Sequence, residues 1–271
     1  MRIPIFDPHC HPDGRNANDY EAMALAGVEK ILAPCSGSGE RRHDGRAWAE
    51  RFDRLLRERE RAACFGIELV VALAVNAADL ASHEAALAGL AELAARLDRP
   101  EVVAVGELAL RTFSAAEEDL FVRQLELARQ AGLPVLIEAP VPTADFHRML
   151  ALLRRELEAG RIAAERVCLL DLDAEKLAAA AALDLGGYGL PVSPPFDGPF
   201  TLRRKVGPCD LPPLLAARGA RGLMLNSGLH YGFADPLCLP RSVLRLRLQG
   251  VADEVLVEIA YANAQRMFLP S

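Results

Sequence analysis

The sequence predicts a single α/β domain, a (β/α)8 TIM barrel that spans residues 1–271. Short apolar runs bounded by turn residues alternate eight times with segments of helical periodicity. No long linker or low-complexity stretch divides the chain, and its length suits one large α/β domain. A doubly wound sheet is the alternative, but no glycine-rich fingerprint follows the first strand.

The eight expected strands are short apolar runs that end at polar or turn residues. They cover residues 2–6, 30–33, 67–75, 102–107, 134–137, 167–170, 188–192 and 222–225. Amphipathic helices are expected between them, first over residues 44–64 and then over residues 79–97. Ser114-x-x-Glu117 is a capping box that begins another helix, and Gly132 ends it.

Composition indicates a globular chain with a large core, since 51% of its residues are hydrophobic and 25% are charged. No apolar run approaches the roughly 18 residues that a membrane span needs, so we expect no membrane association. Met1-Arg2 leads into only four apolar residues, so no signal peptide is expected. The six cysteines are scattered without a C-x-x-C pair, which favours free thiols and a cytoplasmic location.

In a barrel of this kind the chemistry lies where the strands end. The first strand runs into Asp7-Pro8-His9-Cys10-His11. Because strand side chains alternate between faces, Asp7, His9 and His11 are expected to point the same way. A carboxylate and two imidazoles are suitable ligands for a divalent metal ion.

The other strand ends add carboxylates. Glu107 follows Val-Ala-Val-Gly at the fourth strand, where the preceding glycine permits close backbone approach, so we expect Glu107 to be a metal ligand. Glu138 ends the fifth strand, and Asp171 and Asp173 follow the sixth. Asp173 is expected only to cap the next helix.

Four motifs make the whole chain resemble the TatD group of metal-dependent hydrolases, within the amidohydrolase-like superfamily. They are Asp7-x-His9-x-His11, V-x-A-V-G-E at residues 102–107, L-P-V-L-I at 133–137 and Asn263-Ala264-x-Arg266-x-Phe268. The resemblance implies a distorted TIM barrel, one or two divalent metal ions, and hydrolysis of phosphodiester, ester or amide bonds by metal-activated water. It also implies that His9, His11 and Glu107 are metal ligands.

The chain departs from the TatD pattern at three positions. Glu138 stands where the group has a histidine after strand five, and Leu172 stands where it has one after strand six. His230 replaces the usual aspartate after strand eight, or Gly228 does in the commoner register.

Glu138 and His230 thus exchange an imidazole for a carboxylate and the reverse. We therefore expect both to join the metal centre, and either to serve as general base. Asp7 is expected to orient a ligand histidine or to ligate directly. The loss at Leu172 favours one tightly held ion over two. The ion is Zn, Mn or Fe, and the sequence does not distinguish them.

Two basic clusters are expected to face the same mouth. Arg41, Arg42 and Arg46 lie near the loop after strand two, whereas Arg203, Arg204 and Lys205 follow strand seven. Guanidinium groups suit phosphate and carboxylate, so Arg42, Arg203 and Arg204 are expected to bind a small anionic substrate.

TatD proteins are nucleases, but the net charge of −6 makes nucleic acid the less favoured partner here. Two other functions stay open. One is a catalytically degenerate barrel that acts as a scaffold or regulatory protein. The other is a non-hydrolytic metal isomerase or lyase in which His230 moves a proton. The sequence indicates no oligomeric state.

Overall fold

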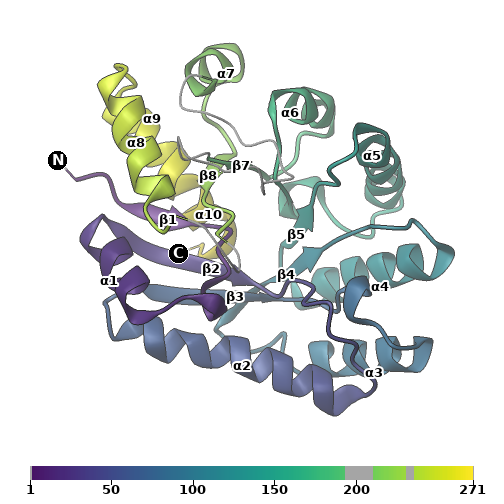
Figure 1. The fold of residues 1–271 in the computed structure, drawn as a ribbon. Coiled ribbons are helices and arrows are strands. Elements are labelled where there is room, and N and C mark those ends of the chain that lie inside the picture. Colours follow the sequence, from purple (N-terminus) through teal and green to yellow (C-terminus); the bar gives the residue numbers. More distant parts are fainter. Residues whose placement is uncertain (1, 193–209, 230–234, 271) are drawn as a thin grey trace.

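A computed structural model describes residues 2–192, 210–229 and 235–270. Eight parallel strands pair in sequence order and form a nearly closed barrel, with the helices arranged around it (Figure 1). The strands are β1 (Ile5–Asp7), β2 (Val28–Pro34), β3 (Glu68–Leu73), β4 (Val102–Leu108), β5 (Val135–Glu138), β6 (Val167–Leu170), β7 (Gly187–Pro191) and β8 (Leu223–Asn226). The predicted (β/α)8 barrel is confirmed, and each of the eight predicted strands overlaps an observed one.

The helices lie between and after the strands. They are α1 (Ala17–Leu25), α2 (Gly45–Ala63), α3 (His83–Ala94), α4 (Ala115–Ala131), α5 (Thr143–Glu158), α6 (Ala174–Ala180), α7 (Leu211–Arg218), α8 (Cys238–Leu248), α9 (Asp253–Val257) and α10 (Asn263–Phe268). None of the described helices is long and apolar enough to cross a membrane.

The predicted helix over residues 79–97 begins later than expected. Ala77–Asp79 forms a short 3-10 turn, and α3 begins at His83 with Ser82 as its N-cap. The buried Asp79 carboxylate accepts hydrogen bonds from the backbone N–H groups of Ser38 and Gly39. Asp79 therefore serves the loop after β2, and Ser82 caps the helix in its place.

The capping box at α4 is formed only in part. The Ser114 hydroxyl accepts from the Glu117 N–H, as predicted, and Gly132 ends the helix with a left-handed backbone. The Glu117 carboxylate instead accepts from the N–H groups of Arg111, Thr112 and Phe113, at 2.9, 2.7 and 2.7 Å. It orders the loop that follows β4.

Two apolar layers hold the barrel together. One layer packs strand residues such as Ile31 and Ala33 against helix residues such as Trp48. The other layer fills the barrel interior, and its members include Phe6, Leu32, Ala72, Ala104, Leu136, Leu170, Met224 and Phe268. Gly106 lies against this interior, where a β-carbon would come within 2.7 Å of the Leu136 Cβ. The strand that carries Glu107 can thus lie close to β5.

The barrel closes at a seam between the segments that follow β1 and β8. A parallel bridge joins Cys10 to Leu229. The His11 N–H donates to the Leu229 carbonyl at 2.7 Å, and the Gly228 N–H donates to the His9 carbonyl at 3.0 Å. The histidine segment is therefore held in place by the segment after β8.

Candidate metal centre

His9, His11 and Glu107 meet in the buried mouth of the barrel. All three residues are buried, and at most 3% of the surface of each is exposed. The two histidine Nε2 atoms lie 3.1 Å apart, and Glu107 Oε1 lies 3.4 Å from His9 Nε2. Glu107 Oε2 lies 3.8 Å from His11 Nε2. The three residues form one group whose ligand atoms all lie within 4.8 Å of one another.

These separations fit a common metal ion. Two donors bound at about 2.1 Å, with angles between 90° and tetrahedral, lie about 3.0–3.4 Å apart. Two of the three separations, 3.1 and 3.4 Å, lie within this range, and the third, 3.8 Å, is longer. Buried ionisable groups are costly unless they are paired or bind a metal. The donor set and its spacing therefore suit a divalent cation.

A second group shares Glu107. Its other members are Glu138 and Asp171, and the three ligand oxygens again lie within 4.8 Å of one another. All three residues are buried. His9 lies between the groups, because its Nδ1 atom is 3.6 Å from Asp171 Oδ1.

Asp171 is the residue that sequence reasoning missed. It directly follows β6 and has a left-handed backbone, with φ at 59°. Its neighbour Leu172 stands where the TatD group has histidine, and it is fully buried in the apolar layer. Asp173 caps α6 through the Lys176 N–H, as predicted. The available signal was the position of Asp171 at a strand end.

Glu138 is the last residue of β5, and its carboxylate is one of the three in the second group. Its Oε2 atom also lies 4.0 Å from Arg111 Nη2, on the loop after β4. The Arg111 side chain is 54% exposed, so this guanidinium stands between the buried carboxylates and solvent. Arg111 was not among the predicted substrate residues.

Unlike His9 and His11, Asp7 is engaged by backbone N–H groups and not by a candidate metal group. Its Oδ1 atom accepts from the Ser227 N–H at 3.1 Å and from the His9 N–H at 3.3 Å. Burial raises the pKa of this carboxyl to about 6. Among the described residues, neither candidate metal group includes Asp7. Strand β1 ends at Asp7, so the strict alternation that placed it beside His9 and His11 does not continue.

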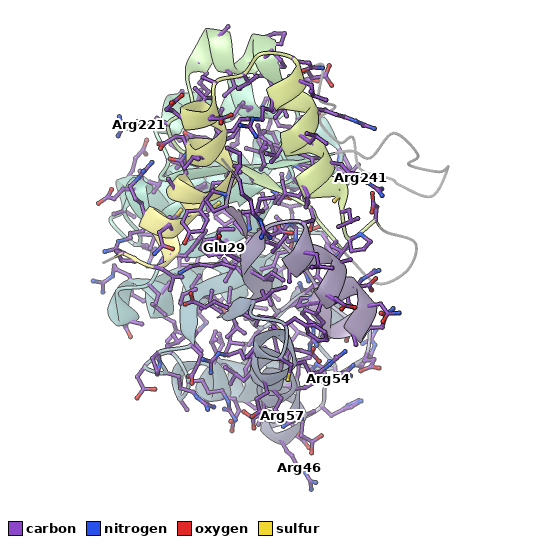
Figure 2. All side chains as sticks on the ribbon, turned by 90° about the vertical axis from the view of Figure 1, so that its left-hand side faces the viewer. Glu29, Arg46, Arg54, Arg57, Arg221 and Arg241 are labelled. Carbon is purple, nitrogen blue, oxygen red and sulfur yellow. The ribbon has the colours of Figure 1, made fainter. Side chains whose placement is uncertain are left out.

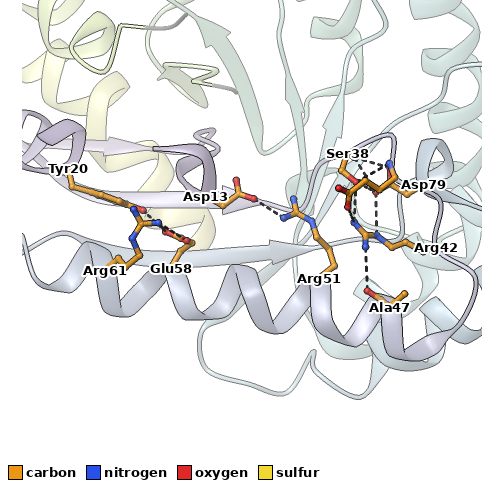
Figure 3. A network of polar contacts seen from close by, with 10 residues as sticks. Asp13, Tyr20, Ser38, Arg42, Ala47, Arg51, Glu58, Arg61 and Asp79 are labelled. Atoms are coloured by element: carbon orange, nitrogen blue, oxygen red, sulfur yellow. Dashed lines mark hydrogen bonds and ion pairs between the residues drawn. The ribbon is translucent and has the colours of Figure 1, made fainter. Parts of the chain in front are cut away.

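Arg42 is engaged within the fold (Figure 3). Its Nη2 atom donates to the Ser38 hydroxyl at 3.0 Å, and its Nε atom lies 3.6 Å from Asp79 Oδ2. Its guanidinium also lies over the Trp48 ring. Arg46 projects from the outer surface of α2 (Figure 2), where it pairs with Glu50. Arg203, Arg204 and His230 lie outside the described residues.

Helix α2 is tied to the segment after β1 and to α1 by two further contacts (Figure 3). Arg51 Nη1 lies 2.7 Å from Asp13 Oδ2, and both side chains are buried. Tyr20 donates to Glu58 at 3.1 Å. Buried pairs of this kind are costly to break, because each partner would be left as an uncompensated buried group. The segment after His11 is thereby fixed on its helix side.

A parallel eight-stranded barrel with a buried histidine–carboxylate cluster at its mouth is the architecture of a metal-dependent hydrolase. Within that class the chain belongs to the TatD related DNase family, whose model matches residues 6–188. The predicted resemblance is confirmed.

The chain is also similar to proteins that are already known. An uncharacterized metal-dependent hydrolase of Methanocaldococcus jannaschii is 26% identical over 266 residues, which cover 97% of this chain and 99% of the relative. The TatD-like protein of Archaeoglobus fulgidus shares the fold with a TM-score of 0.73, at 18% identity, over 97% of this chain and 99% of its own. The phosphotriesterase homology protein of Escherichia coli, solved with phosphate in its active site, gives 0.67 at 14% identity over 99% of both chains.

Proposed function

We propose that this protein hydrolyses a small anionic ester, phosphoester or amide with a metal-activated water. The buried triad of His9, His11 and Glu107, with its ligand-like spacing, is the observation that carries the proposal. A divalent ion bound there lowers the pKa of a bound water and polarises a carbonyl or phosphoryl oxygen. We propose Zn, Mn or Fe as the ion.

The chain's own residues have three roles in this proposal. His9, His11 and Glu107 hold the ion. Asp7 positions the His9 segment against Ser227 through its hydrogen bonds. The general base, which accepts the proton of the attacking water, is Glu138 or His230.

Arg111 supports the choice of an anionic substrate. Its half-exposed guanidinium lies at the rim, next to Glu138. Its backbone is held by the buried Glu117 carboxylate, so the side chain extends from an ordered loop. Arg203 and Arg204 keep their predicted role as further anion-binding residues. We do not assign that role to Arg42, because its guanidinium is already engaged by Ser38 and Asp79.

The names of related proteins suggest which substrates to test. The family model is that of a DNase, one structural neighbour holds phosphate in its active site, and another derives from a lactonase. The net charge of −6 and the half-exposed Arg111 favour a small anion over a nucleic acid.

The test is a hydrolysis panel with protein loaded with Zn, Mn or Fe. It contains phosphomonoesters, phosphodiesters, carboxylesters, lactones and single- and double-stranded DNA. We expect turnover of a small anionic substrate, and loss of that turnover in the double variant His9→Ala, His11→Ala. His147→Ala, at an exposed histidine of α5, is the matched control. Turnover of DNA alone would contradict the substrate class, and full activity of the double variant would contradict the metal centre.

A further inference from the structure

A loop rich in serine and glycine follows β2 and lies against the candidate metal centre. It covers residues 35–39, with the sequence C-S-G-S-G. We infer that Ser36 of this loop and Asn76, in the loop after β3, bind an oxyanion group of the substrate, a carboxylate or a phosphate. The inference rests on the proposed function and deepens it, because it names residues that recognise the negative charge of the substrate.

Cys35 places this loop at the mouth of the barrel. Its N–H donates to the Ala72 carbonyl of β3 at 2.8 Å and also to the Gly106 carbonyl of β4 at 3.3 Å. The Glu107 N–H donates to the Cys35 carbonyl at 3.3 Å. Strands β2 and β4 are not neighbours in the sheet, since β3 lies between them. The chain after β2 therefore reaches past β3 to the backbone of a candidate metal ligand, and Ser36 is the next residue.

Ser36 and Asn76 each carry a buried polar atom without a hydrogen-bond partner among the described residues. These atoms are Ser36 Oγ and Asn76 Nδ2, and the two residues are 6% and 3% exposed. Buried polar groups are normally paired, so both atoms call for an explanation. A hydroxyl can donate and a carboxamide nitrogen can only donate, so a partner that the two share is an acceptor.

The two donors belong to one corner of the mouth, between β2 and β3. Asn76 Oδ1 accepts from the Ala78 N–H at 3.0 Å, which identifies the oxygen and leaves Nδ2 as the atom without a partner in the described part of the chain. A β-carbon on Gly37 would approach Asn76 Oδ1 to 2.7 Å. Glycine at this position therefore lets the loop lie directly against the carboxamide, next to Ser36.

The second half of the loop already binds a carboxylate (Figure 3). Asp79 Oδ1 accepts from the N–H groups of Ser38 and Gly39, both at 2.8 Å, and the Ser38 hydroxyl donates to Asp79 Oδ2 at 3.1 Å. Successive backbone N–H groups of this kind form concave sites for anions. The N–H groups of Ser36 and Gly37, by contrast, donate to no other described residue. The first half of the loop thus has donors available for an anion from outside the chain.

The charges around the loop permit an anion there. The Asp79 carboxylate lies 3.6 Å from Arg42 Nε, so the carboxylate that the loop already holds is paired with a cation. The charge of Glu107 is offset by the ion of the proposed metal centre. Neutral donors fixed in a site that excludes water stabilise an oxyanion more strongly than they would in water.

An ordered water that bridges Ser36 and Asn76 is the competing explanation, since buried waters commonly satisfy such groups. The two explanations differ in what removal of a donor does. A bridging water makes the side chains part of the fold, so their loss lowers stability. A substrate anion makes them part of the binding site, so their loss lowers affinity for anions.

The experiment uses the full chain loaded with one equivalent of Zn²⁺. Inorganic phosphate and acetate are titrated separately by calorimetry, and zinc content is measured by elemental analysis. We expect phosphate, acetate or both to bind, which also shows which oxyanion the site prefers. Ser36→Ala should weaken this binding about tenfold. It should leave the zinc content and the melting temperature unchanged, because the hydroxyl has no partner within the described part of the fold.

Asn76→Asp tests the second donor. Aspartate keeps an acceptor for the Ala78 N–H and replaces Nδ2 by a carboxylate oxygen that repels an anion. We expect anion binding to fall at least tenfold with the zinc content unchanged. Asn18→Asp, the same change at an exposed residue of α1, is the matched control and should bind the anion as the parent protein does. If Asn76→Asp melts far below the parent protein, Ser36→Ala alone decides the test.

Three results would overturn the inference. Unchanged anion binding in a variant that folds like the parent protein would remove the shared site. A lower melting temperature of Ser36→Ala with unchanged anion binding would assign the ordered water. A zinc-loaded parent protein that binds neither anion would refute the oxyanion site and leave the proposed metal centre standing, whereas a parent protein that binds no zinc would refute both.

Discussion

Asp7 and Ser227, 220 residues apart in the chain, are joined by a hydrogen bond of 3.1 Å from the Ser227 N–H to Asp7 Oδ1. The same oxygen accepts from the His9 N–H. One buried carboxylate therefore couples the end of β8 to the segment that carries both histidines. The Ser227 hydroxyl adds to this junction, since it accepts from the Leu229 N–H and contacts the His9 carbonyl.

Replacing Asp7 by alanine should destabilise the protein by about 1–3 kcal/mol, because two buried N–H groups lose their acceptor. Urea unfolding measures this change. Asp98→Ala, at an exposed aspartate, should stay within about 0.5 kcal/mol of the parent protein. Equal stability of the two variants would show that Asp7 does not hold the seam.

Removal of the metal should lower the stability of the fold. An ion present at a hundred times its dissociation constant contributes about 2.7 kcal/mol. For a chain of this size each kcal/mol is worth about 2–4 °C in melting temperature. A chelator should thus lower the melting temperature by several degrees. The variant His9→Ala, His11→Ala should show little response to the chelator, and a full response there would place the ion elsewhere.

Replacing Arg111 by alanine should raise KM for an anionic substrate about tenfold, as expected for loss of one charge-assisted contact. The effect should shrink as ionic strength rises, because salt screens an exposed cation. Steady-state kinetics at low and high salt measure both. Arg46→Ala removes an arginine from the outer surface of α2 and is the control. An unchanged KM, or one raised equally for a neutral substrate, would remove Arg111 from substrate binding.

Replacing Glu117 by alanine should affect stability and KM together. Its carboxylate is the acceptor for three consecutive N–H groups and the Thr112 hydroxyl. Their loss should cost about 1–3 kcal/mol, and the loop should no longer hold Arg111 in place. Urea unfolding and kinetics are both required. Glu118→Ala, one residue further along α4, should change neither quantity. A stability loss without a change in KM would separate this loop from substrate binding.

The barrel was predictable because its signals are local. Each strand is a short apolar run, and the spacing of apolar residues in α2 predicted its limits to within one residue. The start of α3 was not predictable in the same way. Asp79 and Ser82 are both good N-caps, and a contact with Ser38 across the fold decides between them.

The candidate metal centre, too, was predictable only where its signals are local in the sequence. Glu107 lies near the carboxyl end of β4, and its approach to His9 follows from the geometry of a parallel barrel. Asp171 lies one residue before the position of the family histidine, and its left-handed backbone has no signature in the sequence. The sequence therefore did not indicate that Asp171 joins the acidic group. Arg42 looked like a free cation. Its engagement by Asp79 and Ser38 depends on tertiary contacts that no local pattern encodes.

The seam has a consequence for biosynthesis. Chains emerge from the ribosome from the amino terminus, and domains fold as units when their parts are available. Here the histidine segment emerges before its backbone partners, Gly228 and Leu229, which come some 220 residues later. The two histidines therefore lack these backbone contacts until the segment after β8 has emerged. We expect selective metal loading to follow that step.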